Sequence, residues 1–479
     1  MIGSVAGMAH QATSRRPGPG AGVRAAVRAA GERARSSESL RAAWRAFAWS
    51  RLAILAVAVF AALSADQGGV GAANAQRFDE PSLTRPLGGF GDVLASPLAH
   101  WDAVWYLGIA ESGYPSGDSP RIAFFPLYPL LVRAVAELGG GSEAALLLAG
   151  YAVSLAALLG ALVLLYRLAA LELGRPLAAP SLLLLCVFPA SLFLGAPYSE
   201  SLFLLTSVGA FYAARTGHWA WAATAAAAAS GTRSAGVLLL VPLVLIYLYG
   251  PREGKGADDP PGGGGGGWLA ALRPRYALRA DAGWLAALRP KYALRADAGW
   301  LLVAPAGLVA YAIYLGLAHG DPLAFGSVQE YWGREFAGPL GGVWEGLVAA
   351  VAGARQIASG ARDPVFFEQA GGDPFRVAGM NLMLLATLVF ALVGAVGVLR
   401  RLPFAYGAYV VAALMLALSY PVGPQPLMSL PRFLVVLFPL FMWLAIVCEE
   451  RGITDRVAAV SAVGLGLFVT QFAGWQFVA

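Results

Sequence analysis

The sequence predicts an all-α polytopic membrane protein, and three observations carry that prediction. Of the 479 residues, 58% are hydrophobic and only 13% are charged, and the mean hydropathy is +0.64. The apolar residues gather in runs of helical length that are separated by polar stretches. Arginine and lysine border these runs, as the positive-inside rule requires of loops that stay in the cytoplasm. A soluble domain of this length would not combine these features.

Charge, cysteines and the N-terminal residues narrow the class of protein further. The net charge of +6 comes from arginines beside apolar runs, so we expect no nucleic-acid partner. Cys186 and Cys448 lie far apart inside apolar runs, which predicts buried thiols and no disulfide. The first 45 residues contain no apolar core of a cleavable signal peptide. The first hydrophobic run is therefore expected to remain as a signal anchor.

The N-terminal half is predicted to hold a basic tail and a membrane module. Residues 1–46 form the tail, which is expected in the cytoplasm, either as a helix on anionic lipid or as a disordered arm. The module covers 47–249 and includes a first outer loop over 65–143 that is too polar to cross a bilayer. Its predicted spans are 47–64, 144–165, 181–197, 201–214, 218–230 and 236–249.

The first outer loop is predicted to contain two short helices on the membrane surface. Trp101, Trp105 and Ile109 recur every fourth residue around Asp102, and Gly113 stands where such a helix would end. A second helix is expected over 125–138, with a proline at its start and aromatic residues at headgroup depth.

Residues 250–299 differ in character from the modules on either side. A run of glycines over 262–267 precedes a tandem repeat, WLAALRPRYALRADAG from Trp268 and WLAALRPKYALRADAG from Trp284. Two copies are too few to stack a solenoid core, and the glycine run lacks the Lys-Ser/Thr of a phosphate-binding loop. We predict a flexible cytoplasmic linker that arose by duplication.

The C-terminal membrane module covers 300–479 and includes a second outer loop over 319–377. Its predicted spans are 300–318, 378–399, 404–420, 433–448 and 457–472. The chain would then cross the membrane about eleven times with its N-terminus in the cytoplasm, and most of its 34 Lys and Arg residues would face the cytoplasm. This threading predicts a multi-pass protein of the cell membrane whose polar segments meet on the outer face.

Asp102 lies in the outer segment that is richest in aromatic residues. An Asp that precedes an apolar-periodic run is an ordinary helix N-cap. The surrounding aromatic rings are also the groups that bind sugars and prenyl chains, so a catalytic carboxylate that meets a lipid-borne substrate is the second interpretation. Both interpretations stay open at this stage.

Three further charges stand at the ends of predicted spans. Glu200 either caps the helix that follows it or faces a polar site. Arg233 and Arg432 either extend toward lipid headgroups or bind a phosphate. His100 and His319 belong to no cluster with metal-ligand spacing, which predicts a site without a metal. A hydrolase is not expected, since no Gly-x-Ser-x-Gly or Ser-His-Asp order occurs.

Six segments, in order from about Ala99 to Leu440, resemble the motifs of the PIG-V-like family. They read HWDAVWYLGIAESGY, FFPLYPLLVR, FPASLFLGAPYSESLFLL, GTRSAG, GDPLAFGSVQEYWGR and LPRFLVVLFPLF. That family is related to glycosylphosphatidylinositol mannosyltransferase II and belongs to the GT-C class of integral-membrane glycosyltransferases. The resemblance leaves out the arginine-rich tail, the glycine run and the tandem repeat.

The resemblance implies a GT-C fold and transfer of mannose from a polyprenyl-phosphate or dolichyl-phosphate donor. It also implies that Asp102 is the catalytic carboxylate and that the segments of Glu200 and Arg432 line the same cavity. The HWD segment carries one acid, whereas several GT-C branches carry a pair, which favours a mechanism without a bridging metal.

On this basis we expect an inverting glycosyltransferase without cofactors, with Asp102 as the general base and Arg432 and Arg233 as phosphate-binding residues. The acceptor is a lipid, glycan or protein hydroxyl on the outer face. The expected substrate-binding residues are His100, Trp101, Trp105, Tyr106, Tyr114, Tyr198, Glu200, Gln329 and Trp332. The alternative is a lipid or sugar transporter or flippase, which would call for mid-span charges or two matching halves.

Overall fold

The computed structural model describes residues 19–64, 69–117, 119–252, 290–363, 373–423 and 425–478. In α1 and α2 the side chains are described from residues 37 and 71. The described residues form helices joined by turns, and their one isolated bridge pairs Arg334 with Val422. The all-α fold class is thereby confirmed.

Among the described residues, four helices are long and apolar enough to cross a membrane. They are α1 (Pro19–Ser64) over its part Ser37–Ser64, α7 (Glu143–Glu172), α16 (Pro374–Arg401) and α20 (Thr454–Ala473). A further span is possible by length where η6 (Ala296–Val303) and α13 (Ala306–His319) meet at a 42° bend. The chain is thus a multi-pass membrane protein, while the expected number of crossings stays a prediction.

The remaining predicted spans are shorter helices. They are α8 (Arg175–Cys186), α9 (Glu200–Arg215), α10 (Trp219–Thr232), η4 (Ser234–Leu239) with α11 (Leu240–Tyr249), α17 (Phe404–Leu418) and α19 (Phe438–Glu450). Of these, α9 lies deepest, between α7 and α10, and is buried on nearly all sides. A helix that is apolar all round is stable only in such a position.

Helix α1 donates hydrogen bonds to backbone carbonyls that are left without helical partners where the neighbouring helix α8 ends. Between Cys186, where α8 ends, and η3 (Pro189–Leu194), the backbone loses helical hydrogen bonds. Arg51 of α1 donates from Nη1 to the carbonyl oxygen of Ser191 at 2.7 Å and from Nη2 to that of Cys186 at 3.4 Å. An arginine beside a span thus satisfies carbonyls that a bilayer could not.

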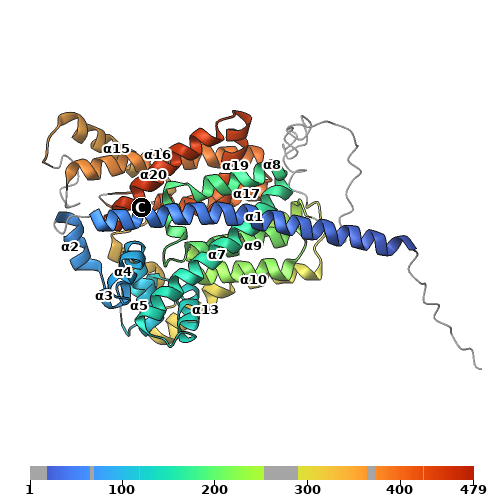
Figure 1. Ribbon diagram of the computed structural model, residues 1–479, viewed down its shortest axis with the longest axis horizontal. Coiled ribbons are helices and arrows are strands. Elements are labelled where there is room, and N and C mark those ends of the chain that lie inside the picture. Colours follow the sequence, from blue (N-terminus) through green and yellow to red (C-terminus); the bar gives the residue numbers. More distant parts are fainter. Residues whose placement is uncertain are drawn as a thin grey trace, which may run out of the picture.

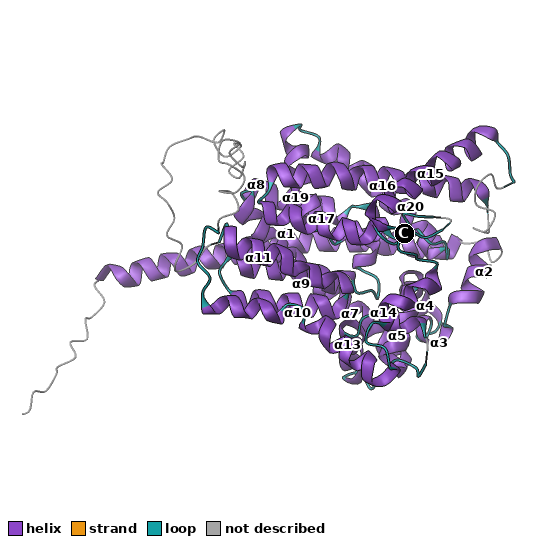
Figure 2. Cartoon of the chain, turned by 180° about the vertical axis from the view of Figure 1, so that it is seen from behind, coloured by secondary structure: helices purple, strands orange, loops and turns teal. Residues whose placement is uncertain are grey.

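The first outer loop folds into short helices at one end of the bundle. These are α2 (Gly69–Phe78), α3 (Pro81–Thr84), α4 (Gly89–Ala95), α5 (Asp102–Ser112) and α6 (Leu127–Glu137). Helices α5 and α6 confirm that two short helices form here, and Gly113 ends α5 with φ of 75°. Their location on the membrane surface stays a prediction. Helices α2 to α5 gather at one end of the bundle, whereas α8 and α11 lie toward the other (Figure 1, Figure 2).

The second outer loop contains a 22-residue helix that its composition does not reveal. This helix, α15 (Gly338–Ser359), packs against α16 and α17. A Cβ at Gly342 would collide with the carbonyl of Leu418, and one at Gly353 would lie 2.8 Å from the carbonyl oxygen of Ala378. Small residues therefore let the helix backbones approach closely, as in other membrane helix pairs.

The described end of the tandem repeat is packed against the bundle. The Tyr247 hydroxyl of α11 donates to Asp297 Oδ1 at 2.6 Å and accepts from the backbone N–H of Arg295 at 3.1 Å. The Arg252 guanidinium lies 4.0 Å from the centre of the Tyr292 ring. Residues 253–289, with the glycine run and the first copy, are outside the described residues, and the predicted linker bounds stay a prediction.

This docking predicts the effect of deleting the second repeat copy, 284–299. The deletion joins Gly283 to Trp300, so that Asp281 of the first copy takes the place of Asp297. We expect an unchanged melting temperature and unchanged activity. Adding Asp281→Ala to the deletion should lower the melting temperature, because loss of the bond to Tyr247 costs ~1–3 kcal/mol. Asp281→Ala in the full chain is the control, and destabilisation by the deletion alone would contradict this account.

Candidate functional site

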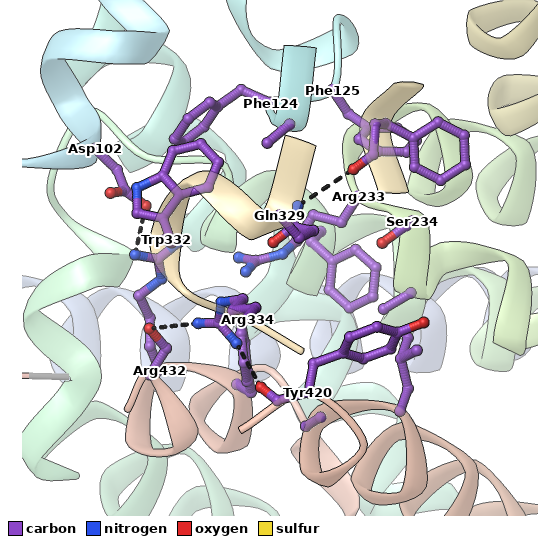
Figure 3. Close-up of a pocket in the computed structure, with 18 of the residues that line it drawn as sticks. Asp102, Phe124, Phe125, Arg233, Ser234, Gln329, Trp332, Arg334, Tyr420 and Arg432 are labelled. Atoms are coloured by element: carbon purple, nitrogen blue, oxygen red, sulfur yellow. Dashed lines mark hydrogen bonds and ion pairs between the residues drawn. The ribbon is translucent and has the colours of Figure 1, made fainter. Parts of the chain in front are cut away.

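A cavity of about 930 Å³ lies at the end of the bundle that carries the first outer loop. Its walls come from α5, η4, α17, the segment around η7 (Val328–Trp332) and α18 (Leu430–Val435). Its charged and amide side chains include Asp102, Arg233, Gln329, Arg334 and Arg432 (Figure 3). Residues far apart in the sequence thus meet in one space.

Three ion pairs run along the wall of this cavity. Arg432 Nη1 lies 2.6 Å from Asp102 Oδ2, and Arg432 Nε lies 2.6 Å from Glu200 Oε1. Arg233 Nη1 lies 2.6 Å from the same oxygen of Glu200. The four side chains come from α18, α5, the start of α9 and the end of α10. The charges at the ends of the predicted spans therefore form one connected cluster.

Asp102 and Glu200 are not helix caps in this arrangement. Trp101 and Ser199 occupy the N-cap positions of α5 and α9, and neither makes a side-chain cap bond. The carboxylate of Asp102 is 20% exposed and faces the cavity, whereas that of Glu200 is fully buried behind Arg432. Of the two interpretations of each acid, capping is excluded, and Asp102 is the carboxylate that a substrate can reach.

The backbone at Asp102 is held by a tyrosine from another segment. Trp101 has φ of 58°, a left-handed conformation that side chains other than glycine rarely adopt. The Tyr198 hydroxyl donates to the His100 carbonyl oxygen at 2.8 Å and accepts from the Asp102 N–H at 3.1 Å. It thus clamps the peptide groups on both sides of Trp101. Tyr198 positions the segment of Asp102 and does not line the cavity.

The predicted site residues divide into those that line the cavity and those that support it. The lining residues are Trp101, Asp102, Trp105, Tyr106, Arg233, Gln329, Trp332 and Arg432. The supporting residues are His100, Tyr114, Tyr198 and Glu200, which are absent from the lining. The side chains of the supporting group do not line the cavity, so they would not contact a sugar bound in it.

His100 is packed away from the cavity. Its ring stacks on Trp475 at a centroid distance of 4.0 Å, and Nδ1 lies 3.1 Å from the Phe472 carbonyl oxygen. Burial lowers the pKa of His100 to about 4, so the ring is neutral at pH 7. The ring therefore belongs to the packing behind the wall and does not reach the cavity.

Tyr114 likewise belongs to the scaffold. Its hydroxyl donates to the Phe124 carbonyl oxygen at 2.6 Å, and its ring packs against Tyr311 and Tyr314. Phe124 itself lines the cavity, with Trp105 and Trp332 at ring distances of 6.1 and 5.8 Å. An aromatic wall thus stands above Asp102, and Tyr114 holds it from behind.

Several residues that line the cavity are absent from the predicted site residues, and Arg334 and Phe477 are two of them. Arg334 follows η7 and points into the cavity beside Arg432 (Figure 3). Phe477 reaches the cavity from the C-terminal segment, where Asn74 and Arg376 bind the backbone carbonyls of Trp475 and Phe477. The sequence signal for Arg334 is that it ends the segment GDPLAFGSVQEYWGR, which resembles a motif of the PIG-V-like family.

The other side of the cavity is apolar. It includes Val237 and Leu238 of η4, Leu308 of α13 and Leu414, Leu416 and Ala417 of α17. Leu416 is 37% exposed although it lies on an apolar membrane-type helix. The cavity therefore joins a charged end to an apolar side.

No metal site is evident in the part of the chain that the structure describes. There, no group of three His, Cys, Asp or Glu side chains is arranged to hold an ion. Asp102 and Glu200 instead take arginines as partners. Metal independence of the site stays a prediction.

Comparisons with known proteins support the family that the motifs resemble. The family model described as mannosyltransferase (PIG-V) matches residues 51–248. A GPI alpha-1,6-mannosyltransferase 2 of Rattus norvegicus is 37% identical over 161 residues, which are 31% of this chain and 32% of the relative. The corresponding protein of Homo sapiens is 34% identical over 29% of each chain.

A GPI mannosyltransferase 2 of Chaetomium globosum is 33% identical over 27% of this chain and 30% of the relative. The chain thus spans about a third of the length of the curated relatives that it matches. No solved structure matches it. The matched segment carries Asp102, Glu200 and Arg233, and over this segment the chain is similar to the PIG-V family.

Proposed function

We propose that the protein transfers mannose from a polyprenyl-phosphate-mannose donor to an acceptor hydroxyl. One observation carries the proposal: a single cavity is lined by a carboxylate and arginines and also by apolar side chains of η4, α13 and α17. A lipid-linked sugar phosphate has the same division into a charged head and an apolar chain. The names of the relatives, which are mannosyltransferases, support the same activity.

In the proposed reaction the acceptor oxygen attacks the anomeric carbon of mannose from the face opposite the phosphate. The new glycosidic bond forms as the bond from that carbon to the phosphate oxygen breaks, so the configuration inverts. Asp102 accepts the proton of the acceptor hydroxyl, and the leaving phosphate keeps the electron pair of the broken bond. Arginines at the polar end stabilise the charge that develops on the phosphate.

The aromatic wall fits the sugar in this proposal. Trp105, Phe124 and Trp332 present ring faces and edges near Asp102, and Gln329 adds an amide. Flat apolar rings pack against the C–H faces of a hexose while polar groups fix its hydroxyls. Tyr106, whose hydroxyl lies 2.7 Å from Ser199 Oγ, completes this side.

The acceptor and the orientation belong to the same proposal. The relatives named GPI mannosyltransferases favour a lipid-linked glycan as acceptor. The excess of Lys and Arg in the segments predicted to be cytoplasmic supports a cavity on the outer face of the cell membrane, with the N-terminus in the cytoplasm. Nucleotide sugars made in the cytoplasm would not reach such a site.

The role of Asp102 predicts the effect of Asp102→Asn. The amide keeps the shape of the side chain but accepts no proton, so the turnover rate should fall ~100-fold or more. The melting temperature should change little, because Arg432 keeps its ion pair with Glu200. Glu111→Gln, the same chemical change at an exposed position of α5, is the control. Activity above roughly a tenth of wild type would reject Asp102 as the base.

The donor and the metal are tested together with purified protein. With polyprenyl-phosphate mannose and an acceptor glycolipid, we expect mannose transfer that continues in excess chelator, because arginines supply the positive charge. Nucleotide-mannose in place of the lipid donor should give no product. Turnover with the nucleotide sugar alone would contradict the proposed donor, and loss of transfer in chelator that a divalent ion restores would contradict metal independence.

A further inference from the structure

The charges at the polar end of the cavity do not balance. Asp102 and Glu200 are the two acids of the cluster, and Arg432 and Arg233 pair with them. Arg334 lines the same cavity and has no carboxylate within ion-pair distance in the described chain. The guanidinium of Arg334 therefore lacks an acidic partner and faces the space that a ligand would fill, whereas Arg77, which also lines the cavity, is exposed to solvent.

Arg334 is held in place by neutral groups. Its Nη1 donates to the carbonyl oxygen of Tyr420 and its Nη2 to Ser429 Oγ, both at 3.4 Å. Its backbone forms the isolated bridge to Val422 just after Gly333, whose φ is 63°. These bonds are longer than the usual 2.7–3.2 Å. They orient the guanidinium without neutralising it.

The surroundings of Arg334 favour an anion. Burial and the positive charge of Arg432 lower the pKa of Arg334 to about 10, and the charge of Asp102 opposes this shift only in part. Its side chain is charged at pH 7 but is poorly compensated. An anion placed against it would relieve repulsion from Arg432 as well as make charge-assisted hydrogen bonds.

We propose that Arg334 binds the phosphate of the lipid carrier, whereas Arg432 and Arg233 are mainly engaged in holding the acids. This subsite rests on the proposed function. It differs from the sequence prediction, which assigns phosphate binding to Arg432 and Arg233. The apolar wall of η4 and α17 provides the path for the polyprenyl chain from this point.

The charge count of the reaction agrees with this subsite. Before transfer, three arginines and two carboxylates carry a net charge of +1, and the phosphodiester of the donor carries one negative charge. During transfer Asp102 takes up a proton, so the cluster gains one positive charge while the leaving phosphate gains one negative charge. The excess charge at Arg334 thus matches the ligand before and after the step.

The test is direct binding of the spent carrier, polyprenyl phosphate, to purified protein in detergent. We compare wild type with Arg334→Gln and Arg334→Lys. Loss of a charge-assisted bond should weaken binding of polyprenyl phosphate ~10–100-fold in Arg334→Gln, and Arg334→Lys should recover part of the affinity because it keeps the charge. Arg77→Gln is the control, since Arg77 is an exposed arginine at the rim of the same cavity.

Two further ligands show what Arg334 recognises. Polyprenol of the same length lacks the phosphate and should bind wild type and Arg334→Gln equally. Inorganic phosphate at the same concentration should not displace the carrier, because it lacks the chain. The subsite is wrong if Arg334→Gln binds polyprenyl phosphate as tightly as wild type, if it loses polyprenol to the same extent, or if inorganic phosphate competes as well as the carrier.

Turnover separates this inference from the proposed function. If wild type transfers mannose and Arg334→Gln keeps both the donor KM and the carrier affinity, the subsite fails and the function stands. If wild type binds the carrier through Arg334 but transfers no mannose, the function fails and the subsite stands. Melting temperatures of the apo variants show whether each one is folded.

Discussion

Arg432 forms ion pairs with both Asp102 and Glu200, and the site depends on this shared contact. Glu200 is fully buried, and a buried carboxylate is tolerated only when cations and hydrogen bonds compensate it. Two arginines do so, one from α10 and one from α18. Because the same Arg432 also holds Asp102, the outer loop is tied to the membrane helices through one guanidinium. Removing Arg432 would leave two acids without their common partner.

The strained backbone at Trp101 marks the point where contacts with the bundle fix the position of the first outer loop. A left-handed tryptophan persists only where its surroundings fix it. Tyr198 binds both flanking peptide groups, and His100 packs on Trp475 from the C-terminal segment. Segments that lie far apart in the sequence therefore aim the carboxylate of Asp102 at the cavity. Aromatic residues that never touch a substrate contribute as much to this as those that would.

The sequence predicts well where polarity and helical period decide the outcome. The apolar runs predicted the helices. The predicted threading also placed Asp102, Glu200 and Arg432 at the same face of the membrane, and from this we expected them to meet. His100 and Tyr114 were expected at the sugar, but they lie behind the wall. A cluster of aromatic residues does not reveal which rings face inward, since packing against distant residues decides that.

Arg334, Phe477 and α15 lie beyond what such patterns can predict. Arg334 is placed by a bridge to Val422, and Phe477 by bonds from the first outer loop and α16, so their positions depend on tertiary contacts. Helix α15 was not predicted, since its sequence is rich in glycine and was assigned to a loop. The helix is stabilised by close packing against α16 and α17, which a sequence pattern does not reveal.

A structure of the protein with bound polyprenyl-phosphate mannose tests the account most directly. It should show the mannose between the aromatic wall and Asp102, the phosphate against Arg334, and the polyprenyl chain along η4 and α17. A second cavity of about 980 Å³ lies between α1, α8 and α20. Donor bound in that cavity, with the space above Asp102 empty, would contradict the account.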